Sequence, residues 1–169
     1  PRWVIRKRSA HCFEGALFAA AALQFIGYKP LIVDMLAEND DDHVIAVFRE
    51  EGLWGAVAKS NFTSLRYREP VYRSLRELIM SYFDFFFNTD GFKSLRSYSR
   101  PFDLTFFESR NWATTDEDLE YIGDKIESLP HYPLAPERII RKLYRASEPM
   151  LRAGLLGSKP EGLYKPKKK

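Results

Sequence analysis

The chain of 169 residues predicts a single α+β domain. Three observations favour this class: an alanine-rich helical segment at 9–26, a hairpin pattern at 43–59, and an amphipathic helical pattern at 70–87. Hydrophobic residues make up 45% of the chain and aromatic residues 15%, which suits a packed core and excludes a disordered protein. We expect the domain to span residues 1–153 and a flexible basic tail to occupy residues 154–169.

The first helical segment, 9–26, is rich in alanine and leucine and carries no charged residue after Glu14. Ser9 is a candidate N-cap, and Gly27 is a candidate for the residue that ends the helix. Because a surface helix would show a polar stripe, we expect this helix to be buried on every side. Gly15 within it predicts that another backbone packs closely against the helix.

Three strands should follow, at 30–36, 43–49 and 53–59, with an acidic loop at 38–42. A short loop at 50–52, with Gly52 suited to a positive φ, joins the second and third strands into a hairpin.

The register of this hairpin places His43 opposite Lys59, Ser60 or Asn61. Opposite side chains on an antiparallel pair share one face and interact.

The second half of the chain predicts a helix at 70–87 with Pro70 in its first turn, and then a strand at 97–108. Further helices are expected at about 115–129 and at 137–146. The predicted order of elements is therefore α-β-β-β-α-β-α-α.

The formal net charge is +3, from 26 basic and 23 acidic residues. Residues 1–8 and 165–169 together hold eight basic groups and no acid, so the rest of the chain carries −5. This distribution argues against a nucleic-acid partner, since nucleic-acid-binding proteins place basic groups on a folded face. No segment reaches the roughly 20 apolar residues of a membrane span, so we expect no membrane partner.

A single cysteine excludes an internal disulfide, and the three histidines show no ligand spacing, so no metal or cofactor is expected. A lone cysteine and the absence of a targeting segment in the sequence make the cytoplasm the expected location.

Cys12 falls in the first turn of the predicted helix, where backbone N–H groups and the helix dipole stabilise a thiolate. His43 heads the second strand, and Asn61 is placed to hold its imidazole in one tautomer. A cysteine, a histidine and an orienting amide form the arrangement that activates a thiol nucleophile. Taken singly, Cys12 is better explained as a small hydrophobic residue at a helix start, and His43 as a strand-edge histidine beside acidic residues.

Residues 9–62 resemble the transglutaminase-like superfamily, within the wider papain-like cysteine fold. In that family a cysteine opens a buried helix, a histidine begins a later strand, and an aspartate or asparagine follows the next strand. The matching residues are Cys12, Gly27, His43, Trp54 and Asn61, with Ser60 as the second candidate for the third position. The sequence departs from the family at 58–60, where the family's acid is expected and no aspartate stands.

The resemblance implies a papain-like core, with a buried cysteine-bearing helix packed on an antiparallel sheet and followed by C-terminal helices. It also implies thiol chemistry on a peptide or another amide: hydrolysis, deamidation or acyl transfer. Trp54, Ser60, Arg66 and Arg68 are the candidate substrate-binding residues, since arginine binds carboxylates and phosphates well. The alternative is a non-catalytic protein of the same fold that binds a partner or small ligand in the same groove.

Overall fold

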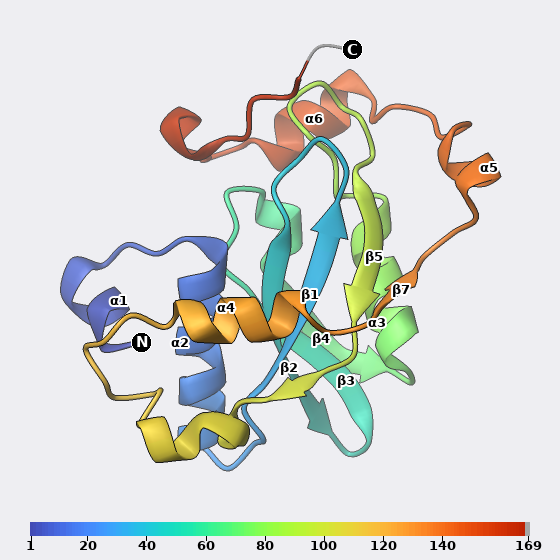
Figure 1. The fold of residues 1–169 in the computed structure, drawn as a ribbon. Helices are drawn as coiled ribbons and strands as arrows, with labels where there is room; N and C mark the ends of the chain where they lie inside the picture. The colour runs from blue at the N-terminus through green and yellow to red at the C-terminus, as the bar shows by residue number, and fades with distance from the viewer. Residues whose placement is uncertain (168–169) are drawn as a thin grey trace.

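The fold is an antiparallel sheet with helices packed on both of its faces (Figure 1). In the computed structural model, which describes residues 1–167, the sheet has seven strands. Six of them follow the order β4-β3-β2-β1-β5-β7, and β6 pairs with β1. The predicted α+β class is confirmed.

The strands are β1 (Leu31–Ala37), β2 (His43–Glu50), β3 (Leu53–Val57), β4 (Tyr67–Tyr72), β5 (Leu95–Ser99), β6 (Phe102–Asp103) and β7 (His131–Pro133). The α-helices are α1 (Arg2–Lys7), α2 (Cys12–Phe25), α3 (Leu75–Phe83), α4 (Glu120–Glu127), α5 (Glu137–Ile140) and α6 (Glu148–Gly154). Short 3₁₀ helices are η1 (Thr63–Leu65), η2 (Leu104–Arg110) and η3 (Pro160–Gly162).

The predicted hairpin of β2 and β3 is confirmed in position and register. Glu50 pairs with Leu53 and Ala46 with Val57, and Gly52 in the turn has a φ of +86°. Pairing ends at Val57, because the chain then turns away from the sheet toward η1. Consequently β3 is too short to hold residues 59–61 opposite His43, and these residues lie in a loop.

The first helix is confirmed, but it begins at Cys12 with His11 as its N-cap rather than Ser9. The Glu14 carboxylate accepts a hydrogen bond from the His11 backbone N–H at 2.8 Å. Gly27 ends the helix with a φ of +97°, as predicted.

Two expectations for α2 have opposite outcomes. A Cβ on Gly15 would lie 2.3 Å from the Lys59 Cβ, so the close approach predicted there is confirmed. Burial on every side is not: Phe18, Ala22 and Phe25 form an exposed stripe, and Phe25 is 91% exposed. The stripe stays exposed because α2 packs on the sheet with its opposite side only.

The helix predicted at 70–87 was wrong at both ends, since α3 spans only Leu75–Phe83. Residues 67–72 form strand β4, and α3 begins at Leu75 after an N-cap at Ser74, whose hydroxyl accepts from the Glu77 N–H at 3.1 Å. Pro70 fits in β4 because this strand lies at the edge of the sheet, where a missing N–H is tolerated.

Other boundaries also differ from the predictions. The strand expected at 97–108 is instead two short strands, β5 (Leu95–Ser99) and β6 (Phe102–Asp103), followed by η2. The Asp103 carboxylate caps η2 by accepting from the Thr105 N–H at 3.0 Å. The helix expected at 137–146 is the single turn α5. Helices α1 and α6 and strand β7 were not predicted, since each is short and lacks a strong periodic pattern.

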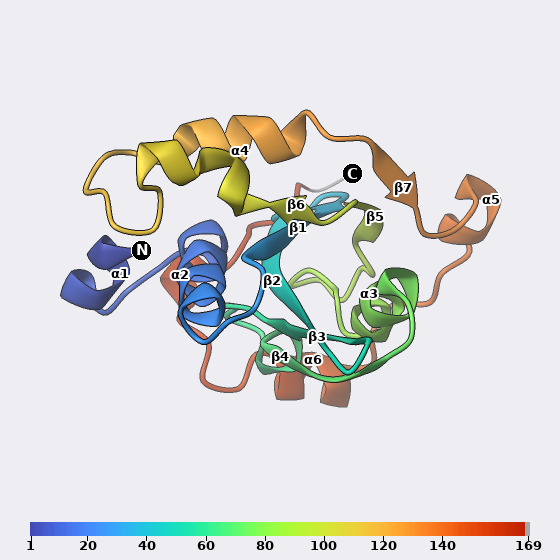
Figure 2. The same ribbon diagram turned by 90° about the horizontal axis from the view of Figure 1, so that it is seen from below.

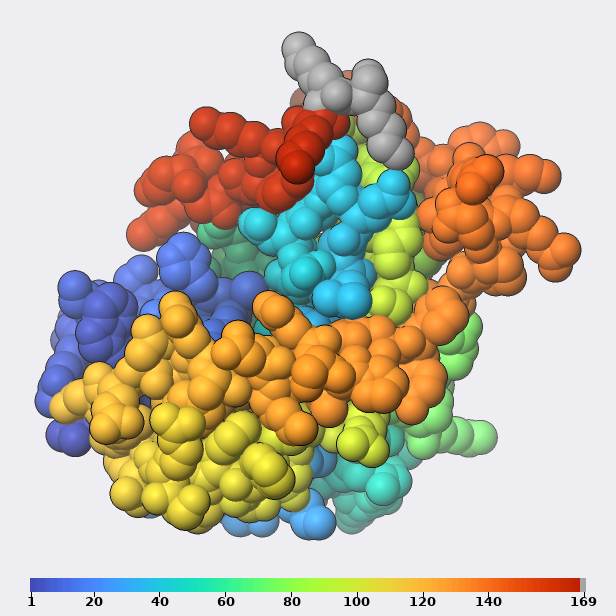
Figure 3. All heavy atoms as spheres, in the orientation of Figure 1, coloured from blue at the N-terminus to red at the C-terminus, as the bar shows by residue number. Residues whose placement is uncertain are grey.

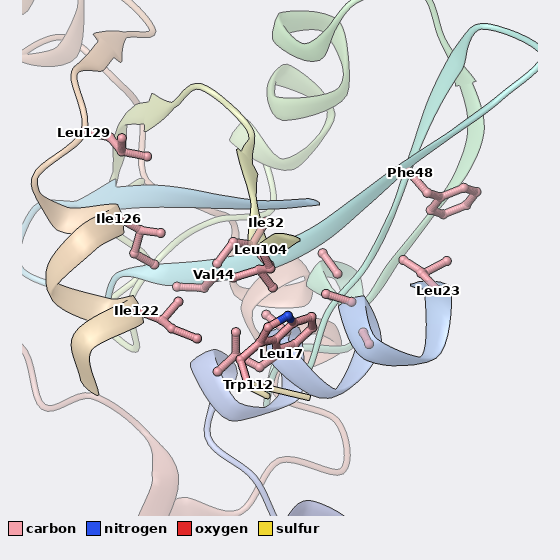
Figure 4. Close-up of a cluster of buried hydrophobic side chains, with 14 residues drawn as sticks. Leu17, Leu23, Ile32, Val44, Phe48, Leu104, Trp112, Ile122, Ile126 and Leu129 are labelled. Atoms are coloured by element: carbon pink, nitrogen blue, oxygen red, sulfur yellow. The ribbon is translucent and has the colours of Figure 1, made fainter. Parts of the chain in front are cut away.

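The sheet separates two hydrophobic clusters. One lies between the sheet and helices α2 and α4, and we call this side the α2 face; Figure 4 shows its side chains, including Leu17, Val44 and Ile122. The other lies beneath α3 and includes Ile45, Leu78 and Tyr82; we call this side the α3 face. Figure 2 shows α2 and α3 on opposite sides of β2.

The segment after α6 runs back over the sheet end as η3 and an extended stretch. Residues 154–167, which fall in the region expected to be a flexible basic tail, form hydrogen bonds with the domain at Asn61 and Asn39. Lys168 and Lys169, the end of that expected tail, lie outside the described residues.

Candidate functional site

Cys12 is the first residue of α2 and is partly buried. Its thiol donates a hydrogen bond to the Asp42 carbonyl oxygen, with 3.7 Å between sulfur and oxygen. Burial raises the pKa of Cys12, and hydrogen bonds from the backbone of Val44, Phe13 and Cys12 itself oppose that rise. The net direction is upward, so the expectation of a lowered pKa at this helix start is not met.

His43 is buried, with 5% of its surface exposed. The Leu65 backbone forms a hydrogen bond with its ring, and the ring packs edge-on against Phe86 with 6.1 Å between ring centroids. Its Nε2 has no hydrogen-bond partner among the described residues. Desolvation lowers the pKa of His43 to about 4, so the ring is neutral at physiological pH.

Cys12 and His43 lie on different faces of β2. The strand alternates, so that Val44 and Ala46 belong to the α2 face, whereas Ile45 and Val47 belong to the α3 face. His43 shares the α3 face with Ile45 and meets Phe86 there. The geometric prediction that the thiol and the imidazole face one another is therefore not fulfilled.

Asn61 and Ser60, the candidates for the third position, are engaged elsewhere. The Asn61 Nδ2 donates to the Gly162 carbonyl at 2.7 Å. The Ser60 hydroxyl accepts from the Phe62 N–H at 3.1 Å. Both residues sit in the loop after β3, and the structure records no bond from either to His43.

Trp54 lies at the far end of the hairpin from His43. It pairs with Arg49, six residues along β2 from His43, which corresponds to about 20 Å of strand. The Arg49 guanidinium stacks on the Trp54 ring, with 5.0 Å from its carbon to the ring centroid. Trp54 therefore packs at the hairpin tip rather than beside Cys12.

Arg66 and Arg68 are also committed to internal partners. The Arg66 Nε donates to the Ser60 carbonyl at 2.9 Å. Arg68 donates to the Ser64 carbonyl and to the Ser81 hydroxyl, both at 2.8 Å, and its guanidinium stacks over Tyr82 at 3.9 Å. These bonds hold β4 to η1 and α3, on the α3 face.

A carboxylate–imidazole pair does form in this protein, but between Asp34 and His131. The His131 Nε2 lies 3.0 Å from an Asp34 carboxylate oxygen, and both side chains are largely buried. Burial raises the pKa of Asp34, and the bond to His131 opposes that rise. The pair joins β1 to β7 across β5, which indicates a role in holding the edge of the sheet.

A pocket of about 610 Å³ opens beside the start of α2. Apolar side chains from three segments line it: Trp3 and Val4, Phe13 and Leu17, and Leu119. Acidic side chains line it too, among them Glu14, Glu117 and Glu120. His11 lines the pocket, but Cys12 does not.

This pocket is not predictable from the sequence, because two of its walls come from elements without a strong pattern. Helix α1 was not predicted, and residues 115–119 form a loop before α4 rather than its first turns. The acidic run at 116–118 is visible in the sequence, but it falls within the helix expected at about 115–129, whereas α4 in fact begins at Glu120.

The described residues contain no group of three or more histidine, cysteine or acidic side chains placed to hold a metal ion. Among the helices in residues 1–167, none has the length and apolar character needed to cross a membrane. No protein-family model matches the chain, and no curated protein is significantly similar to it.

Proposed function

We propose that this chain is a non-catalytic protein of transglutaminase-like architecture, which binds a partner or small ligand in the pocket beside the start of α2. The observation that carries the proposal is the separation of Cys12 and His43 onto the α2 and α3 faces. Thiol-dependent amide chemistry needs a base within hydrogen-bond reach of the sulfur. The groups that form hydrogen bonds with the Cys12 sulfur are backbone groups, which cannot act as that base.

The raised pKa of Cys12 gives further support to the proposal. A thiol that stays protonated at neutral pH is a poor nucleophile, because the thiolate is the reactive form. His43 cannot serve as an acid or a charged partner near pH 7, since its pKa is about 4.

The lining of the pocket suggests the class of ligand. Its apolar wall suits a hydrocarbon or aromatic body, and the carboxylates of Glu117 and Glu120 suit a positive charge. We therefore expect an amine with an apolar body, either as a small molecule or as a side chain of a partner.

Alkylation of Cys12 tests the non-catalytic part of the proposal. Iodoacetamide should react slowly at neutral pH, with a midpoint above the ordinary range of a thiol, and the pH profile of His43→Leu should match that of the wild type. A midpoint well below that range, together with a loss of reactivity in His43→Leu, would instead support a catalytic pair.

Fluorescence of Trp3 tests the pocket. Phenethylamine should change the emission saturably, and 2-phenylethanol, its neutral counterpart, should bind at least several-fold more weakly. A Glu117→Gln, Glu120→Gln double variant should reduce that difference, and Trp3→Phe should abolish the signal and so locate it. Equal binding of the amine and the alcohol would refute the charge selection, and no saturable binding of either would refute the pocket.

A further inference from the structure

Residues 158–167, which we call the strap, run beside the turn between β1 and β2 (Figure 3, red beside cyan). The side-chain amide of Asn39 bonds to the strap in both directions. Its Nδ2 donates to the Lys167 carbonyl at 3.1 Å, and its Oδ1 accepts from the Lys167 N–H at 2.8 Å. The Asn39 amide thus pairs with both main-chain polar groups of one residue, and its Oδ1 also accepts from the Tyr164 hydroxyl at 3.5 Å.

Asn39 is held in place for this contact. It has a φ of +53°, in the left-handed region that asparagine tolerates better than most residues. Its carbonyl accepts from the Nδ2 of Asn88 at 3.0 Å, and Asn88 is 1% exposed. The side-chain oxygen of Asn88 in turn accepts from two backbone N–H groups. The contact with the strap is therefore supported from the interior.

Two further side chains bond to the strap, and both also bond to its main chain. Asn61 donates to the Gly162 carbonyl at 2.7 Å, and Thr89 donates to the Tyr164 carbonyl at 3.4 Å. A Cβ on Gly162 would lie 2.7 Å from the Asn61 Nδ2, so a larger residue here would displace the Asn61 amide from its bond to the Gly162 carbonyl. Asn39, Asn61 and Thr89 come from three separate loops, and we call them the strap site.

The strap and the loop beside it carry opposite net charges. The strap carries Lys159, Lys165 and Lys167 against Glu161, whereas the β1–β2 loop beside it contains the acidic run 40–42. The backbone is extended at Leu163, between the Asn61 and Thr89 contacts. Main-chain bonds to an extended segment, with a favourable charge, are the terms that govern recognition of extended peptides.

The strap is joined to the domain by an exposed turn. Before it, Gly154 of α6 packs tightly, since a Cβ there would lie 3.0 Å from Phe62 and 3.2 Å from Phe87. Gly157 is exposed, has a φ of +71°, and has open space around its Cβ position. Helix α6 is thus fixed by packing, while the strap beyond Gly157 is held by the strap site.

We propose that the strap site is a binding site for a lysine-bearing peptide segment, made of a short 3₁₀ turn and an extended stretch, and that the chain's own strap is its displaceable occupant. This inference does not depend on the pocket beside α2. Asn61, the residue expected to orient His43, acts here as a peptide-binding residue.

The first test is exchange after cleavage. A protease site introduced at 156–158 allows the folded protein to be cut between α6 and the strap. The freed fragment should remain bound and should exchange with a labelled peptide of the strap sequence Ser-Lys-Pro-Glu-Gly-Leu-Tyr-Lys-Pro-Lys. The uncut protein should resist the peptide, because a tethered segment has an effective concentration of roughly millimolar.

Two matched peptides sharpen this test. A peptide with alanine at the position of Gly162 should bind at least several-fold more weakly, because of the clash with Asn61, whereas alanine at the position of Glu161 should have little effect. Release of the fragment without saturable binding of the labelled peptide at about 1 mM would overturn the proposal. Equal binding of the two alanine peptides would overturn the assigned contacts.

The second test uses point variants of the uncut chain. Gly162→Ala should raise hydrogen exchange of the Lys167 amide by about tenfold, as expected when one hydrogen bond in a short segment is lost. Glu161→Ala is the control and should leave exchange unchanged. The melting temperature should not change in either variant, since both residues are exposed. Identical exchange in the two variants would show that the strap is not held at Asn61.

Discussion

The two faces of the central sheet are covered by helices of different kinds. Helix α2 presents small residues, Ala16 and Ala20, and lies close enough for Gly15 to meet the Lys59 side chain. The α3 face is instead filled by large side chains, including Tyr82 and Phe86. Helix α2 therefore approaches the sheet closely through small residues, whereas α3 is held further from it by larger side chains.

This difference decides the fate of the two candidate catalytic residues. Cys12 lies at the close contact, where its sulfur meets the backbone at Asp42. His43 lies among the rings, where desolvation keeps it neutral. Residues on one strand that are adjacent in sequence point to opposite faces, so a shift of one position along β2 separates a base from a nucleophile.

The largest effect should come from removing one leucine from each face. Leu17→Ala on α2 and Leu78→Ala on α3 remove equal volumes from sites exposed by 1% and 0%. Each should lower the free energy of unfolding by about 2–5 kcal/mol. Urea denaturation gives the two values, and alkylation under native conditions should show faster reaction of Cys12 in Leu17→Ala only. Equal acceleration in both variants would mean that the faces are not independent.

The fold was predictable where a local pattern determined it. The β2–β3 register followed from the loop containing Gly52, and the end of α2 followed from Gly27. The second helix was predicted to begin too early because of Pro70. Proline suits the first turn of a helix, but it is also tolerated in an edge strand such as β4. Only the pairing of β4 with β3 distinguishes the two.

The candidate site was less predictable, for a reason that lies in β2. Apolar residues occupy both faces of this strand, so hydrophobicity gave no sign of the face on which His43 would fall. The position of Asn61 was likewise undetermined, because its partner Gly162 is 101 residues away. Short-range patterns carry no information about such a contact.

The next largest effect is a dependence of folding stability on pH, which arises from His43 on the α3 face. The pKa of His43 falls from 6.5 in the unfolded chain to about 4 in the fold. The unfolded state therefore binds the proton more readily, and stability attributable to His43 is lost as the pH falls from 6.5 toward 4. The full difference corresponds to about 3 kcal/mol.

Asp40 gives the matched control with the opposite sign. Burial raises its pKa from 3.8 to about 6, so its contribution to stability is lost as the pH rises through that interval. Relative to the wild type, His43→Leu should gain stability on acidification, and Asp40→Asn should gain stability as the pH rises from 4 to 6. Denaturation midpoints at several pH values measure both. An unchanged difference between His43→Leu and the wild type at pH 4 and pH 7 would show that His43 is accessible to water.

A smaller effect should separate the two arginines once expected to bind substrate. Arg68 makes several hydrogen bonds and stacks on Tyr82, so Arg68→Ala should cost about 1–3 kcal/mol. Arg66 is exposed and bonds to one carbonyl, so Arg66→Ala should cost less than about 1 kcal/mol. Thermal denaturation of the two variants measures this difference in stability. A loss of stability in Arg66→Ala equal to that in Arg68→Ala would contradict the internal role assigned to Arg68.

The smallest effect, and the most direct comparison of the faces, comes from exchanging two neighbours on β2. The double variant His43→Val, Val44→His moves the imidazole to the α2 face, where the Val44 backbone already bonds to the Cys12 sulfur. An imidazole there can take the thiol proton, so alkylation at pH 7 should be about tenfold faster than in the wild type.

Two control variants separate the imidazole from changes in packing. His43→Val alone makes the same substitution on the α3 face without placing an imidazole on the α2 face, and it should leave the alkylation rate unchanged. Because histidine at 44 also disturbs packing around α2, Val44→Gln serves as a control of similar size and polarity. An equal rate in Val44→Gln and the exchanged variant would mean that the gain came from loosened packing and not from the imidazole. A faster rate confined to the exchanged variant, with a pH profile set by a histidine, would show that the start of α2 can support a reactive thiol. It would also show that the natural thiol is unreactive because His43 lies on the α3 face.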